Sequence, residues 1–209
     1  YGVAVGNNNT ATGQYGASFG SLNHTSGLGS TAVGYGNQSV GLHAATFGYS
    51  NIAWSDRSMA IGNVSQANGA SSIALGRGAN THSYSEIALG SFNTVYTPAS
   101  ATEWNGADRL LVLGNGPNDS EMSNALTVLK NGNMAIGNIN PTTKLDVNGQ
   151  VRIRGGAPGA GKVLTSDANG LATWQTPSGS QWITNGSNIY YNAGNVGIGT
   201  SNPSKAKLE

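Results

Sequence analysis

One short stretch of the sequence has the residue spacing of a phosphate-binding loop. In Gly156-Ala-Pro-Gly-Ala-Gly161-Lys162 the glycines and the lysine are placed as such loops place them. The next residue is Val163, where the motif needs serine or threonine to hold Mg²⁺. Residues 163–170 have the pattern of a strand and a turn, not of the helix whose N-terminus would face the phosphates. The sequence therefore favours a flexible glycine connector over a nucleotide site.

Histidines and carboxylates could form a metal or acid–base site only if they converge. His24, His43 and His82 occupy different places in the repeat described below, and Asp56 and Glu86 are also out of register. Further along, four acidic residues cluster in sequence and leave a polysaccharide-cleaving activity as an alternative: Glu103, Asp108, Asp119 and Glu121. We expect no catalytic residue, no metal site and no cofactor.

Composition excludes several classes of function. Charged residues make up 9% of the chain, well below the roughly 25% of ordinary domains, while 32 of 209 residues are glycine. A net charge of +1 gives no electrostatic reason to bind nucleic acid. No apolar stretch approaches the 18 or so residues of a membrane helix, so we expect no membrane insertion in this segment. Cysteine is absent, which excludes disulfides and thiolate metal sites.

The elements that must carry any function are set by a repeat of 14 residues. A small residue, a large apolar residue and then glycine recur seven times in register, and a weaker echo follows seven residues later. The repeat glycines are Gly6, Gly20, Gly34, Gly48, Gly62, Gly76 and Gly90. Units this short cannot bury a core alone and must stack, so the sequence predicts an all-β solenoid with two short strands in each turn.

The two faces of the predicted strands differ in residue size. Positions before the repeat glycine alternate between large apolar residues, such as Phe19 and Phe47, and residues no larger than threonine, such as Ala60 and Ala74. A chain that is apolar on both strand faces must cover the second face, and another copy of itself is the simplest cover. We therefore expect an obligate homo-oligomer, with a trimer preferred over a monomeric solenoid.

The repeat resembles a known family. Ser58-Met59-Ala60-Ile61-Gly62 and Ser72-Ile73-Ala74-Leu75-Gly76 are similar to the S-x-A-φ-G repeat of the YadA-like heads of trimeric autotransporter adhesins. The resemblance covers residues 1–93. It implies a left-handed parallel β-roll, three chains intertwined in a homotrimer, and an adhesive head.

The rest of the chain departs from the repeat. Residues 94–129 form an insertion and transition segment, in which 94–107 is a binding loop or a cap on the end of the stack. Residues 130–154 form a hairpin module with turns at Asn131-Gly132 and Asn148-Gly149. Residues 155–209 form a second module, with hairpins at 167–170 and 185–186 and a truncated repeat at 195–208. These β-hairpin, β-prism-like modules resemble repeats of tail-fibre and surface proteins of Bacteroidetes-type bacteria and their phages.

Aromatic side chains on the predicted bends are the candidates for receptor binding. Tyr35 and Tyr49 share one place in consecutive turns and should form an aromatic ladder, which either binds a ligand or only stiffens the stack. The other candidates are His43, Trp54 and Arg57, which we expect nearby on the bends, and Tyr96 and Trp104 in the insertion.

The sequence as a whole predicts a non-enzymatic trimeric fibre protein that binds a host-surface glycan or protein. An extracellular tail fibre of a phage or injection machine, attached to other fibre or baseplate proteins, is favoured. A cell-surface trimeric adhesin is the alternative, and a depolymerase comes third. Since the phrase that ends at Glu209 is cut short relative to its earlier copy, we expect the natural protein to extend further.

Overall fold

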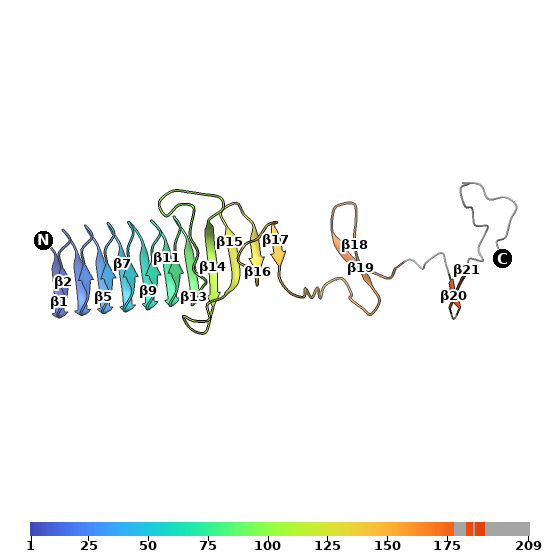
Figure 1. Cartoon of the computed structure of the whole chain (residues 1–209), viewed down its shortest axis with the longest axis horizontal. Coiled ribbons are helices and arrows are strands. Elements are labelled where there is room, and N and C mark those ends of the chain that lie inside the picture. The colour runs from blue at the N-terminus through green and yellow to red at the C-terminus, as the bar shows by residue number, and fades with distance from the viewer. Residues whose placement is uncertain (178–182, 186, 191–209) are drawn as a thin grey trace. The chain divides into compact units, whose positions relative to one another are not determined.

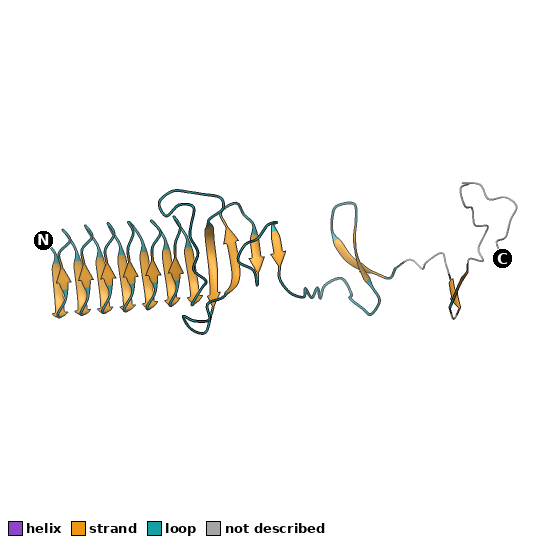
Figure 2. Cartoon of the chain, in the orientation of Figure 1, coloured by secondary structure: helices purple, strands orange, loops and turns teal. Residues whose placement is uncertain are grey.

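The computed structural model describes residues 1–177, 183–185 and 187–190, and its described residues are strands, turns and loops with no helix (Figures 1 and 2). The chain divides into two compact units, Tyr1–Gln150 and Val151–Glu209. The first unit is a parallel β-solenoid, as the 14-residue repeat predicts. The predicted all-β fold class is therefore confirmed.

Each turn of the solenoid contributes one long and one short strand. The long strands are β1 (Val3–Asn7), β3 (Ala17–Ser21), β5 (Thr31–Tyr35), β7 (Ala45–Tyr49), β9 (Met59–Asn63), β11 (Ile73–Arg77) and β13 (Ile87–Ser91). The short strands are β2 (Thr10–Ala11), β4 (His24–Thr25), β6 (Gln38–Ser39), β8 (Ile52–Ala53), β10 (Gln66–Ala67) and β12 (Asn80–Thr81). Long strands pair in parallel with long strands, and short strands with short strands, each residue with the one 14 positions on.

The core lies between these two sheets and is built from small residues. Ala32, Ala60, Ala74 and Ala88, from the small-residue column of the long strands, are fully buried. Where the column holds a hydroxyl it pairs across the core, as Thr46 Oγ1 does with Ser39 Oγ at 2.7 Å. Small inward side chains let the two sheets approach closely. The large apolar side chains of the same strands therefore point outward.

The repeat glycines occupy the fourth of the five positions in each long strand, next to the bend that follows. Gly48 has a φ of +117°, and a Cβ placed there would collide with the carbonyl oxygen of Gly62 in the next turn. Only glycine fits both this backbone conformation and this close approach. The glycine column predicted from the sequence is thus a requirement of stacking.

A ladder of asparagine side chains runs inside the same bends. Asn9, Asn23, Asn37 and Asn51 occupy one place in consecutive turns, and the Nδ2 of each of the last three donates to the Oδ1 of the asparagine one turn earlier at 3.0 Å. Each Oδ1 also accepts the backbone N–H of the residue at the same place in the next turn, as Asn23 Oδ1 does from Asn37 N at 3.1 Å and Asn51 Oδ1 does from Ser65 N at 2.9 Å. These bonds satisfy buried backbone groups that the bends leave without a sheet partner. The ladder ends where Ser65 takes the place of asparagine.

The 94–107 insertion is followed by one more parallel strand. β14 (Arg109–Asn115) pairs with β13, with Gly114 opposite Gly90, so the repeat register resumes after the insertion. The sheet then continues through antiparallel β15 (Asn124–Leu129) and β16 (Met134–Ile136), joined by the predicted tight turn at Asn131-Gly132. The solenoid thus passes into an antiparallel end without a break in its long sheet.

The prediction of a hairpin at Asn148-Gly149 is wrong. β17 (Leu145–Val147) pairs in parallel with β16, and residues 151–154 form no strand. The alternation of Val151 and Ile153 with arginines imitates a strand, but no neighbouring strand offers them a partner and both side chains are exposed. The 138–144 connection instead carries the chain back to start a parallel strand beside β16.

The described residues of the second unit form two short hairpins. β18 (Val163–Ser166) pairs antiparallel with β19 (Ala172–Gln175) around the predicted turn at 167–170. β18 begins directly after Lys162, so a strand follows the phosphate-loop-like stretch as predicted. β20 (Ile183–Asn185) pairs antiparallel with β21 (Asn188–Tyr190). The predicted repeat at 195–208 lies outside the described residues, and the division at 93, 129 and 154 stays a prediction.

Candidate functional site

The predicted aromatic ladder is present on the surface of the first unit. The rings of Tyr35 and Tyr49 are stacked with centroids 5.3 Å apart and planes 4° apart. Both residues end a long strand, and about half of each side chain is exposed. The ladder is therefore both a cross-strand packing contact and an accessible aromatic surface, so its role in binding stays a prediction.

His43 and Arg57 do not join this ladder. Both have positive φ and lie in the bends that lead into the long strands, whereas the tyrosines lie where those strands end. The expectation that they lie near the tyrosines is wrong, because residues nine places and one place after a repeat glycine fall on opposite edges of the solenoid. Trp54 is half exposed. It follows the short strand β8 and lies on the same edge of the solenoid as Arg57.

The insertion lies along the bends of the last turns. Ala70 N donates to Ala101 O at 2.8 Å, and Tyr84 N donates to Ser100 O at 3.2 Å. Asp108, fully buried, accepts hydrogen bonds from Ala99 N and Ser100 N. These contacts cover backbone groups at the edge, which is what a cap does.

The two aromatic candidates of the insertion have different environments. Tyr96 is half-buried, and the Arg109 guanidinium lies 4.2 Å from the centre of its ring. Its hydroxyl accepts a 3.1 Å bond from Arg109 N. Trp104 is 58% exposed, with the Lys130 ammonium 5.6 Å from its ring centre. Tyr96 therefore anchors the insertion to β14, whereas the side chain of Trp104 is accessible on the surface of the insertion.

A buried polar cluster lies beneath the insertion and was not predicted. Glu86 is fully buried, and its Oε2 accepts the backbone N–H groups of His82 and Ser83, each at 2.8 Å. Glu86 Oε1 and His82 Nδ1 have no hydrogen-bond partner among the described residues. Lys130 Nζ donates to Ser83 Oγ at 2.8 Å.

Burial sets the protonation of this cluster. It raises the pKa of Glu86, against the opposing effects of two backbone hydrogen bonds and of Arg109. Burial, with the nearby Arg109 charge, lowers the pKa of His82 to about 4. Arg109 itself is held by Thr94, whose carbonyl and hydroxyl oxygens accept from its guanidinium at 2.6 and 2.9 Å. Since the insertion covers the cluster, these groups hold the insertion in place.

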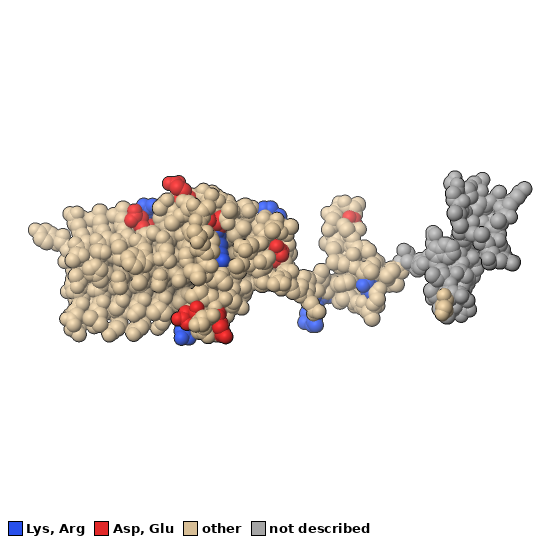
Figure 3. Space-filling view, viewed as in Figure 1, with Lys and Arg blue, Asp and Glu red and all other residues tan. Residues whose placement is uncertain are grey.

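The remaining acidic residues do not converge on one site. Glu103 is exposed in the insertion, whereas Asp119 and Glu121 are exposed in the 116–123 loop between β14 and β15. Figure 3 shows acidic side chains on both long edges of the first unit, with mostly uncharged surface between them. In the part of the chain that the structure describes, no group of three or more potential ligands could hold a metal ion, and no helix is long and apolar enough to cross a membrane.

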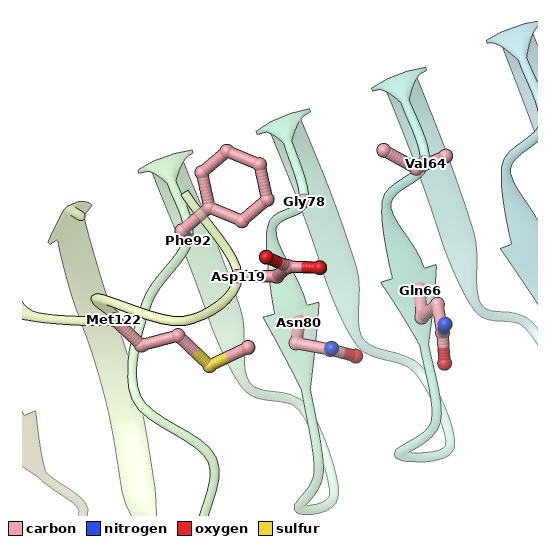
Figure 4. A pocket seen from close by; sticks show the side chains of 7 residues that line it. All are labelled: Val64, Gln66, Gly78, Asn80, Phe92, Asp119 and Met122. Carbon is pink, nitrogen blue, oxygen red and sulfur yellow. The ribbon is translucent and has the colours of Figure 1, made fainter. Parts of the chain in front are cut away.

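A small groove lies where the 116–123 loop meets the ends of the last turns (Figure 4). Its volume is about 280 Å³. Its lining combines apolar and polar side chains around one glycine: Val64, Gln66, Gly78, Asn80, Phe92, Asp119 and Met122. The loop is fixed to the turn beneath it, since Gly116 N donates to Ser91 O at 3.0 Å and Ser123 N to Phe92 O at 3.1 Å.

The solenoid matches a family model at two places. Residues 11–37 and 47–79 match the YadA head domain repeat. This stretch is similar to YadA head repeats. No curated protein and no solved structure was found to match the chain. The match supports the resemblance stated for the head segment and does not extend to the tail-fibre-like modules beyond residue 130.

The sequence held signals for two of the unpredicted features. Glu86 stands in a column of the repeat that elsewhere holds small residues, such as Ser58 and Ser72. A carboxylate in such a column marks a turn that differs from the rest. The second signal was the column three places after the repeat glycine, which holds asparagine in four consecutive turns, from Asn9 to Asn51. The groove had no such signal, because Asp119 and Met122 come from outside the repeat.

Proposed function

We propose that the YadA-like head is the adhesive part of a homotrimeric fibre displayed outside the cell. The observation that carries this proposal is the row of large apolar side chains on the outer face of the long strands. In a single chain they are 37–54% exposed: Val3, Val5, Phe19, Phe47, Leu75 and Ile87. A continuous apolar face of this kind favours burial against another protein surface.

Copies of the same chain fit this face best. Three parallel solenoids would present identical columns to one another in every turn, and closed cyclic symmetry is the usual arrangement of homo-oligomers. The YadA head repeat supports the same assembly, since the resemblance implies a homotrimer. Three identical weak sites on a rigid head would bind a surface by avidity.

The function is proposed as non-enzymatic attachment. The acidic residues that could cleave a glycan are divided between two edges of the first unit, and backbone N–H groups bond to Glu86 Oε2 and to both carboxylate oxygens of Asp108. Host-surface glycans or proteins are the proposed ligands. Incubation with capsular polysaccharide should leave glycan length unchanged, and shortened products would instead support a depolymerase.

Two measurements test the proposal. Sedimentation equilibrium at micromolar concentration should give three times the mass of the chain, 21.2 kDa. The trimer should adhere to immobilised host-cell surface material. A folded monomer in which these apolar side chains stay in contact with water would contradict the proposal.

The fibre could be a cell-surface adhesin of a bacterium or a tail fibre of a phage or injection machine. The YadA head repeat supports the cell-surface adhesin, whereas the tail-fibre alternative rests on the resemblance of residues 130–209 alone. The domains that accompany this head in the natural protein would separate the two. A membrane-anchoring domain favours the adhesin, and a self-cleaving chaperone favours the tail fibre with its baseplate partners.

A further inference from the structure

The groove beside the 116–123 loop has unused hydrogen-bonding groups. Asn80 Oδ1 accepts from Asn68 Nδ2 at 3.0 Å, which leaves Asn80 Nδ2 as a donor with no partner among the described residues. The Gln66 amide has no hydrogen bond to any described residue. The Asp119 carboxylate receives a single long bond, 3.3 Å, from Ser120 Oγ. Both donors and acceptors thus line one small space (Figure 4).

Apolar groups complete the groove and are firmly placed. The Phe92 ring lies against Gly78, where any Cβ would collide with it. On another side the Arg77 guanidinium lies 5.2 Å from the centre of the ring. Val64 and Met122 add further apolar surface. A ligand here would meet an apolar wall and polar side chains together.

The charges restrict the ligand. Two carboxylates, Asp119 in the groove and Glu121 in the same loop, outnumber the one cation beside the Phe92 ring, Arg77, so the local charge disfavours an anion. A simple cation would pair with Asp119 but would leave the amide donors of Asn80 and Gln66 unused. A neutral sugar ring suits all of these groups, since its hydroxyls both donate and accept and its C–H face is apolar. We propose that this groove binds one neutral pyranose unit of a surface glycan.

Size and position fit this ligand. At about 280 Å³ the groove is at or below the lower end of drug-sized pockets, which suits one sugar ring. Its lining comes from the bends after the long strands, from the short strands β10 and β12 and from the 116–123 loop, whereas the proposed subunit interface uses the faces of the long strands. The inference rests on the proposed adhesive function and names the ligand class of one site.

Binding of methyl pyranosides to the full chain tests the proposal. Saturation-transfer NMR should detect methyl glycosides of neutral hexoses, and titration should give at least 10-fold weaker binding for glucuronate and sialic acid. Asp119→Ala and Asn80→Ala should each weaken binding of the neutral glycosides about 10-fold. Glu121→Gln changes a carboxylate of the same loop outside the groove and should bind as the wild type does. Circular dichroism checks that each variant is folded.

Two results would overturn the proposal: no neutral pyranoside binds, or folded Asp119→Ala and Asn80→Ala bind as well as the wild type. An adhesion assay on the same proteins separates this failure from that of the proposed function. If wild type and Asp119→Ala adhere equally while no pyranoside binds, the groove assignment fails and adhesion stands. If pyranoside binding depends on Asp119 in a chain that is monomeric and does not adhere, the groove assignment stands alone.

Discussion

The side chain of Asn51 donates a 3.0 Å hydrogen bond from Nδ2 to Oδ1 of Asn37, one turn earlier in the solenoid. The same Nδ2 also contacts the carbonyl oxygens of Phe47 and Gly62. One asparagine therefore joins three consecutive turns. The ladder fixes the bends at the edge that carries the stacked tyrosines.

Replacing a central residue of this ladder should destabilise the head. Asn37→Ala removes three donated bonds and leaves buried partners in the turns on either side unsatisfied. We expect a loss of roughly 3 kcal/mol in the free energy of unfolding, measured by urea denaturation. Asn63→Ala is the control, because that asparagine is exposed at the end of β9. Equal midpoints for the two variants would contradict a structural role for the ladder.

Replacing a repeat glycine should be at least as damaging. Gly48→Ala combines a φ of +117° with a collision against the Gly62 carbonyl oxygen. We expect a loss of roughly 3 kcal/mol or more in stability, seen as a lower thermal midpoint by circular dichroism. Gly155→Ala, where a Cβ would have open space, should leave the midpoint unchanged. A stable Gly48→Ala protein would mean that the turns can separate without loss.

A charge on the outer apolar face should dissociate the proposed trimer. Phe47→Asp places a carboxylate on the face of the long strands, where the phenylalanine is 37% exposed in a single chain. Burying that charge between subunits is unfavourable, so we expect light scattering to show that the mass of the trimer is lost. Leu28→Asp, at a similarly exposed leucine in a bend, should remain trimeric. A trimeric Phe47→Asp protein would place the interface elsewhere.

Acid should loosen the contact between the insertion and the last turn. The pKa of His82 is about 4 in the folded chain against an ordinary 6.5, so the unfolded chain binds the additional proton between these values. The contribution of His82 to the free energy of unfolding is therefore complete above pH 6.5 and decreases as the pH falls towards 4. Glu86 has a raised pKa and acts in the opposite direction.

A His82→Gln variant isolates the histidine contribution, because Glu86 titrates in both proteins. Urea midpoints measured from pH 7 to pH 4 should fall more steeply in the wild type than in the variant. Parallel curves would mean that His82 gains no proton on unfolding in this range.

The sequence was most informative where one pattern repeats. A single turn such as 45–58 has little meaning alone, but seven aligned copies require stacking, place the small residues inside and align Tyr35 with Tyr49. The hairpin at 167–170 could also be predicted, because its turn is local. Stacking and local turns each depend on residues that the sequence places in a simple relation.

What the sequence did not predict depends on contacts between distant segments. Val151 and Ile153 alternate as a strand would, yet β16 pairs with β17 in parallel and leaves them unpaired. The cluster around Glu86 requires Lys130 to approach from far along the chain. His43 and Tyr35 were both assigned to bends, but the sequence alone gave no reason to separate the two edges. Such juxtapositions are set by tertiary packing.

The constant spacing of the turns also bears on how such heads can change length. Deleting residues 45–58 would bring Met59 into the register now held by Ala45, against strands whose backbone and core contacts are nearly the same. Duplicating them would do the reverse. Each event alters the head by one step of about 4.8 Å and leaves both neighbours compatible. Deletion or duplication of a turn can therefore change the length of the head during evolution without any substitution in its core.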